Sequence, residues 1–194
     1  MKEVLVMVLV FAATLTGCAA PMHYSQAEGL SRGDAFTTEV NASSRGEKLG
    51  EFGTDLKNAK KARAHNIALA ASKIDGAVIE PGKEFSYNET VGPTTKNNGF
   101  KLGMIFISGE KSEGYGGGVC QVSSTLFNAA EKAGMEITER NDHSRPVGYV
   151  EPGRDAATSY GVIDFKFVNP REKAVEINAF VKDERIICEI YVRN

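Results

Sequence analysis

The sequence predicts an α+β fold with two main helices packed on a largely antiparallel β-sheet. Two segments carry apolar residues at the helical period, and the last third of the chain is rich in short β-type runs. These runs are joined by short connections, which favour antiparallel neighbours. The chain has 194 residues, of which 42% are hydrophobic, and this is enough to bury a core.

Apolar spacing predicts the two helices. The first covers residues 56–74, where apolar residues recur at i, i+3, i+4 and i+7 from Ile67, and Asp75-Gly76 ends it. The second follows a run of three glycines and has apolar residues at i, i+4, i+7, i+8 and i+11 from Val122. Gly134 is a natural C-terminal cap for this helix.

Strands are predicted where β-branched and aromatic residues are bounded by turn residues. Pro81-Gly82 separates two short strands, and Asn169-Pro170 separates two longer ones. The residues 109–111 form a turn that leads one strand back toward the glycine run. The predicted strands are 78–79, 84–87, 101–108, 137–140, 162–168, 174–181 and 186–192.

The N-terminus has the pattern of a targeting segment. Residues 4–15 are apolar apart from Thr14, too short to span a bilayer, and end in Leu15-Thr16-Gly17-Cys18, which resembles a bacterial lipobox. We expect a lipoprotein signal in residues 1–18 with a lipid on Cys18, a flexible tether in 19–48 and a folded domain in 49–194. A plain signal peptide or a short anchor is the alternative. Both interpretations place the chain outside the cytoplasm.

Charge and cysteine content exclude two classes. The net charge is −2 and no basic run occurs, so we expect no nucleic-acid partner. Apart from Cys18 the chain has only Cys120 and Cys188, which do not make a disulfide scaffold. Cys188 lies in a β-type run and is interpreted as a small buried hydrophobe. A bridge between Cys120 and Cys188 is the alternative in an oxidising compartment.

The run Gly116-Gly117-Gly118-Val119-Cys120 delivers a cysteine to the start of the second helix. Unpaired N–H groups and the helix dipole at such a position favour the thiolate. Three successive glycines also let another molecule approach the backbone. Cys120 is therefore a candidate nucleophile. The alternative is that it packs, buried, beside the glycine turn.

His143 and Asp155 are the candidate partners of Cys120. The order of helix-start cysteine, strand-associated histidine and carboxylate is similar to that of papain-like and transglutaminase-like thiol enzymes, so an architecture of that type is included in the predicted fold class. In such a site the histidine takes the thiol proton, the carboxylate orients the imidazole, and helix-start N–H groups bind the oxyanion. The glycine run would supply these N–H groups.

Each candidate also has a structural interpretation. His143 is then a loop residue bonded to a carbonyl, and Asp155 pairs with Arg154 or caps a turn. His65, in the first helix, is interpreted as structural but replaces His143 as the base if the helices meet. His65, His143, Cys120 and Asp155 are of types that bind zinc, yet their spacing is not that of a metal site, so we expect no metal and no cofactor.

Five segments resemble the VanW family, named for an accessory gene of vancomycin-resistance clusters. The resemblance implies a bacterial cell-envelope protein. Members often carry peptidoglycan-binding-like segments ahead of this domain, for which the expected tether is too short. The segments are 66–76, 81–93, 116–129, 143–150 and 153–156.

Two functions follow from these residues. The first is a thiol acyltransferase or peptidase that acts on peptidoglycan stem peptides through Cys120, His143 and Asp155. The second is a non-catalytic module that binds peptidoglycan, in which the glycine turn and two arginines hold a carboxylate-rich glycopeptide. The candidate binding residues are Gly116, Gly117, Gly118, Gln121, Ser123, Arg145 and Arg154.

Overall fold

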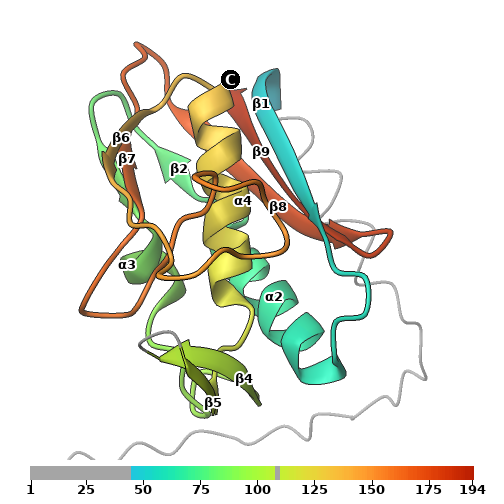
Figure 1. Cartoon of the computed structure of the whole chain (residues 1–194). Helices are drawn as coiled ribbons and strands as arrows, with labels where there is room; N and C mark the ends of the chain where they lie inside the picture. Colours follow the sequence, from blue (N-terminus) through green and yellow to red (C-terminus); the bar gives the residue numbers. More distant parts are fainter. Residues whose placement is uncertain (1–44, 108–109) are drawn as a thin grey trace, which may run out of the picture. The chain divides into compact units, whose positions relative to one another are not determined.

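The computed structural model describes residues 45–107 and 110–194, and in this part of the chain it contains three helices and nine strands (Figure 1). All paired strands are antiparallel, in sheets of four, three and two strands. The predicted α+β class is confirmed. No helix in the described part is long and apolar enough to cross a membrane.

The four-stranded sheet is the base of the core. Its order is β1 (Arg45–Asp55), β9 (Arg185–Arg193), β8 (Val175–Lys182) and β2 (Val78–Ile79). Helices α2 (Lys61–Ile74) and α4 (Val119–Lys132) pack on this sheet, α2 against β8 and α4 against β1 and β9. Burial of their apolar faces is the main stabilising contribution to such a layer.

The N-terminal strand begins earlier than the domain boundary expected at residue 49. Residues 45–48, expected to belong to the tether, lie in β1, where Arg45 Nε is 2.9 Å from Glu176 Oε1 and Lys48 Nζ is 2.6 Å from Glu189 Oε1. These cross-strand ion pairs hold polar residues that show no strand pattern of their own. The predicted signal, Cys18 and the remaining tether lie outside the described residues.

Helix α2 begins at Lys61, later than the predicted residue 56. The Leu56 N–H donates to the Glu184 carbonyl at 2.7 Å, and Asn58 has a φ of +63°, so this segment is held as a turn. A short helix, α3 (Tyr87–Val91), replaces the end of the strand predicted over 84–87. Ser86 caps it by accepting a hydrogen bond from the Glu89 N–H at 3.1 Å.

The second sheet has the order β3 (Glu84–Ser86), β7 (Lys166–Val168) and β6 (Glu136–Glu139). Strand β7 is shorter than the predicted 162–168. Asp164 explains the difference, because its carboxylate accepts hydrogen bonds from Ser86 Oγ at 2.6 Å and from the Asn88 N–H at 2.9 Å. These bonds hold Asp164 at the start of α3, so that the segment before residue 166 does not pair with β3 as a strand.

The third sheet is a hairpin of β4 (Leu102–Ile107) and β5 (Glu110–Tyr115) that leads into α4 (Figure 1). The turn predicted over 109–111 is wrong for Glu110 and Lys111, which lie in β5, while residue 109 lies outside the described part. The sequence of β5 is rich in charged residues and glycine and shows no alternation of apolar residues. Pairing with β4 is what stabilises it as a strand.

Helix α4 is confirmed over nearly its predicted length and lies between the large sheet and the segment 140–158, which crosses in front of it in Figure 1. Most of its residues are therefore buried, including polar Ser123, Thr125 and Asn128. Its N-cap is Gly118, with a φ of +108°, and Gly134 follows its end with a φ of +71°. Tyr87 Oη donates to the Val119 carbonyl at 3.0 Å and fixes the first turn.

Replacing Gly118 with alanine is expected to lower the free energy of unfolding by about 2–4 kcal/mol. Its φ lies where side chains are strained, and a Cβ there would be 2.8 Å from Ile67 Cγ1. Urea denaturation measures the effect. Gly148→Ala is the matched control, because nothing lies within 4 Å of a Cβ there and its φ is ordinary. Equal stability of the two variants would refute this account.

Candidate functional site

The glycine run packs tightly against the protein itself. A Cβ on Gly116 would lie 2.5 Å from Thr94 Cβ, and one on Gly117 would lie 2.5 Å from the Met104 carbonyl oxygen. Both glycines are buried. Close packing of the β5–α4 turn accounts for glycine at these positions, and their role in binding a ligand stays a prediction.

Cys120 is the second residue of α4 and a free, half-buried thiol. Its Sγ donates to the Thr158 carbonyl at 3.4 Å and lies 3.8 Å from Thr158 Oγ1. Burial alone would raise the pKa of this thiol, but the His143 imidazole, through its hydrogen bond and its charge, outweighs burial and lowers the pKa below the ordinary value. The site thus favours a thiolate.

The N–H of Cys120 is one of several N–H groups near the start of α4 that donate to no backbone carbonyl outside the helix. The Val119 N–H donates to the Gly116 carbonyl at 3.0 Å and the Gln121 N–H to the Gly118 carbonyl at 2.9 Å. Among the described residues the Cys120 N–H has no acceptor. A donor on the nucleophile itself is suited to an oxyanion that forms on the attacked carbonyl. We therefore expect the Cys120 N–H to take part in binding an oxyanion, and the glycine run stays the other predicted source of N–H donors.

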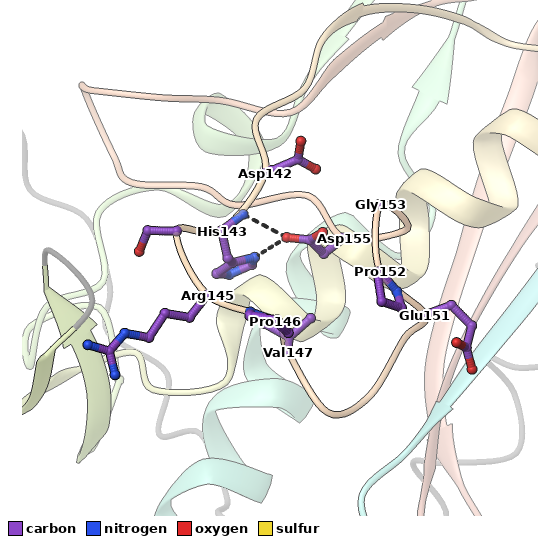
Figure 2. A pocket seen from close by; sticks show the side chains of 10 residues that line it. Asp142, His143, Arg145, Pro146, Val147, Glu151, Pro152, Gly153 and Asp155 are labelled. Atoms are coloured by element: carbon purple, nitrogen blue, oxygen red, sulfur yellow. Dashed lines mark hydrogen bonds and ion pairs between the residues drawn. The ribbon is translucent and has the colours of Figure 1, made fainter.

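His143 and Asp155 form a close pair (Figure 2). Asp155 Oδ2 lies 2.5 Å from His143 Nδ1 and accepts the His143 backbone N–H at 2.7 Å. Burial would lower the pKa of His143, but its bonds to Cys120 and Asp155 raise it above its usual value. Burial would raise the pKa of Asp155, but the bonds from His143 lower it. With Nδ1 held by Asp155, Nε2 is the nitrogen left for the thiol.

Arg140 holds Asp155 in place through its main chain and its carboxylate. Its Nε donates to the Asp155 carbonyl at 2.6 Å, a guanidinium nitrogen lies 3.6 Å from Asp155 Oδ1, and the guanidinium lies 4.9 Å from the centre of the Phe127 ring. Arg154 instead pairs with Glu131 at 2.5 Å. The alternative in which Asp155 pairs with Arg154 is therefore not what the structure shows.

Two serines of α4 tie the helix to the segment that carries Asp155. Ser123 Oγ donates to the Ala156 carbonyl at 2.7 Å, and the Ala156 N–H donates to Ser124 Oγ at 2.9 Å. Ser123 is fully buried, so its role is to position the segment rather than to touch a ligand. Its place among the candidate binding residues stays a prediction that these internal hydrogen bonds do not support.

Gln121 is committed to internal hydrogen bonds. Its amide nitrogen donates to Thr54 Oγ1 and to the Asp55 carbonyl, both at 2.9 Å, and its oxygen accepts from Arg63 at 2.8 Å. Because both amide protons are used, Gln121 has none for a bound carbonyl, contrary to the expectation. Arg154 is likewise engaged, since its Nε also donates to Asn128 Oδ1 at 2.7 Å.

Arg145 is exposed and, within the described residues, forms no ion pair. It lines a pocket of about 220 Å³ that also exposes His143 and Asp155. In Figure 2 its guanidinium points away from Asp155, and Glu151 lies on the opposite rim. Cys120 does not line this pocket. The pocket therefore reaches the site from the imidazole side.

His65 lies at a different place from the thiol. Its Nε2 lies 2.9 Å from the Gly99 carbonyl oxygen, and the imidazole beside Cys120 is that of His143. In the described part of the chain no group of three histidine, cysteine, aspartate or glutamate side chains is arranged to hold a metal ion. Cys188 is fully buried, and burial raises the pKa of its thiol, as its interpretation as a buried hydrophobe requires.

Thr158, Tyr149 and Arg140 belong to the site but were absent from the predicted set. Burial, and then the charge of Cys120, raise the pKa of the Tyr149 phenol, which is also bonded to Ser124. Tyr149 lies in one of the segments that carry the family resemblance, which was the available signal. No sequence pattern marks Thr158 as a site residue, because it reaches the Cys120 sulfur only through the folding of segment 140–158 back onto α4.

A family model described as "VanW like protein" matches residues 62–191. The chain is 46% identical over 145 residues to an uncharacterized protein YoaR of Bacillus subtilis (strain 168), covering 75% of this chain and 48% of that protein. It is 31% identical over 134 residues to the vancomycin B-type resistance protein VanW of Enterococcus faecalis (strain ATCC 700802 / V583), covering 66% of this chain and 49% of that one. The chain thus spans about half the length of these relatives. No solved structure matches it significantly.

Proposed function

The chain belongs to the VanW-like family, and from this premise we propose that it is a cell-envelope thiol enzyme that transfers or hydrolyses acyl groups of peptidoglycan stem peptides. The observation that supports this is the pairing of Asp155 with His143, together with the lowered pKa of the Cys120 thiol at the start of α4, for which burial is outweighed by His143. A purely structural cysteine needs neither an imidazole partner nor a carboxylate behind that imidazole.

The chemistry follows from the positions of these groups. The Cys120 thiol gives its proton to His143 Nε2, and the thiolate attacks an amide carbonyl carbon. The oxyanion lies at the Cys120 N–H. When the C–N bond breaks, the leaving amine takes the proton from His143 and a thioester remains on Cys120. Water or a second amine then attacks the thioester, gives a proton to His143, and releases the acid or a new amide.

The choice of stem peptides rests on the family and on the expected location. One relative is named a vancomycin resistance protein, and the N-terminal pattern of this chain is that of an exported lipoprotein with Cys18 as the lipid attachment site. Peptide stems of the wall are then the amides that this thiol meets outside the cytoplasm. In this proposal a lipid on Cys18 anchors the chain to the bacterial membrane.

Mass spectrometry of the intact protein tests the proposal. The full chain carrying Cys188→Ser, in detergent, is incubated with muropeptides released from peptidoglycan. We expect a covalent adduct on the tryptic peptide containing Cys120 and a change in the muropeptide mixture. A protein that stays unmodified, with unchanged muropeptides over several envelope preparations, would count against the enzyme.

The second candidate is a module that binds peptidoglycan without chemistry. Arg145 favours it, because its exposed guanidinium lies at the rim of the 220 Å³ pocket and forms no ion pair with the described residues. In this version Arg154 takes no part, since Glu131 and Asn128 occupy its guanidinium. A binding module tolerates alanine at Cys120, whereas the enzyme does not.

A further inference from the structure

Arg63 of helix α2 lies beside the reactive end of α4. One of its guanidinium nitrogens donates to Gln121 Oε1 at 2.8 Å, and Gln121 directly follows Cys120. Its Cγ would be 3.0 Å from a Cβ built on Gly118, the residue that caps the helix. Arg63 therefore packs against the turn that presents the thiol.

Tyr149 gives an independent link between the guanidinium and the thiol. The charges of Cys120 and Arg63 both act on the Tyr149 phenol, the first raising its pKa and the second lowering it. Tyr149 is itself bonded to Ser124, on the turn of α4 that follows Cys120. Arg63 and Cys120 thus both act on the same phenol through their charges.

The charge of Arg63 is not matched inside the protein. Among the described residues no carboxylate lies within ion-pair distance of it, and Gln121 accepts its single side-chain hydrogen bond. Asp55, whose carbonyl also accepts from Gln121, pairs with Arg185, and Asp155 of the site pairs with His143 and Arg140. A half-buried guanidinium with five donors and one neutral acceptor is suited to bind a carboxylate in the bidentate manner.

We propose that Arg63 binds a carboxylate of the substrate close to the bond that Cys120 attacks. The inference rests on the proposed function and specifies it. The substrate class is a peptide with a free carboxylate within about one residue of the scissile amide, such as a stem peptide attacked next to its C-terminal residue. A peptide with this carboxylate amidated lacks the group that Arg63 recognises. Arg63 is in this sense a specificity-determining residue.

Two alkylating reagents test this without knowledge of the substrate. N-bromoacetyl-alanine and its carboxamide differ only in the carboxylate, and each transfers its acyl-methylene group to the thiolate as a C–S bond forms and bromide leaves. Rates are measured at pH 7 on the full chain with Cys18→Ser and Cys188→Ser, which leaves Cys120 as the one thiol. We expect the acid to react faster than the amide, and Arg63→Gln to reduce the ratio of the two rates by about tenfold. A structural effect of the variant slows both reagents and leaves this ratio unchanged.

Arg193→Gln is the matched control, because Arg193 is an exposed arginine at the end of β9 to which no role in the site is assigned, and we expect it to keep the ratio. Arg63→Lys, which preserves the charge if Arg63→Gln does not fold, is expected to give an intermediate ratio. The inference is overturned if acid and amide react alike in the parent protein, or if Arg193→Gln removes the preference as Arg63→Gln does. The rate with the neutral amide reports separately on the thiolate, so an ordinary slow thiol would contradict the proposed enzyme and not the Arg63 site.

Discussion

Iodoacetamide is expected to modify Cys120 rapidly at pH 6–7, and replacement of His143 with alanine is expected to slow this reaction by more than about tenfold. The thiolate is the species that reacts. In the intact site the hydrogen bond and charge of His143 outweigh burial and lower the pKa of Cys120. Without the imidazole, burial dominates and moves the pKa of the thiol in the opposite direction.

The pH dependence of alkylation follows from the directions in which the pKa values of Cys120 and His143 are shifted. The pKa of Cys120 is lowered and that of His143 is raised, so the thiolate appears, as the pH rises, while the imidazole is still protonated. The alkylation rate should therefore level off well below the ordinary thiol pKa of about 8.5. In His143→Ala the rate should continue to rise above that pH.

Two features make this measurement specific. Cys188 is fully buried and its pKa is raised, and the substitutions Cys18→Ser and Cys188→Ser together leave Cys120 as the one cysteine of the chain. His65→Ala is the matched control, because His65 bonds to the Gly99 carbonyl and not to the thiol. A profile that is the same in all three proteins, with an ordinary thiol midpoint, would mean that Cys120 and His143 do not act as a pair.

Local sequence patterns predict the elements whose stability comes from their own buried faces. Helix α4 and strands β8 and β9 are of this kind, since their apolar residues recur at one period and lie in the core. Strand β1 and the hairpin strand β5 are not, because their charged and glycine residues become strands only through long-range pairing. Residues 84–87 are predicted as a strand, whereas Ser86 ends β3 and caps the short helix α3.

The residues of the candidate site likewise fall into those that a local sequence pattern predicts and those whose role depends on long-range contacts. Residue type and position in the chain pointed to Cys120, His143 and Asp155, and the structure brings the three together although their role in catalysis stays a prediction. Chemical type alone also suggested Gln121, Ser123 and Arg154, which the fold uses for its own hydrogen bonds. Whether a polar side chain is free depends on partners from distant segments, which no local pattern contains.

Replacing Cys120 with alanine is expected to abolish adduct formation and to reduce turnover of muropeptides by at least about 10³-fold. Without sulfur there is no nucleophile, and neither His143 nor the Cys120 backbone N–H can replace it. The fold should remain, because alanine suits the first turn of a helix and the thiol is only half-buried. Thermal unfolding, measured alongside the assay, should therefore change by only a few degrees.

The same variant separates the two proposed functions, because it removes chemistry but leaves the pocket and Arg145 in place. If the protein is an enzyme, Cys120→Ala still sediments with purified peptidoglycan as the parent does and produces no new muropeptide. Arg145→Gln, which leaves the thiol intact, should then weaken sedimentation more than it slows alkylation. If parent and Cys120→Ala bind equally and neither changes a muropeptide, the thiol has no chemical role and the binding module is the function that remains.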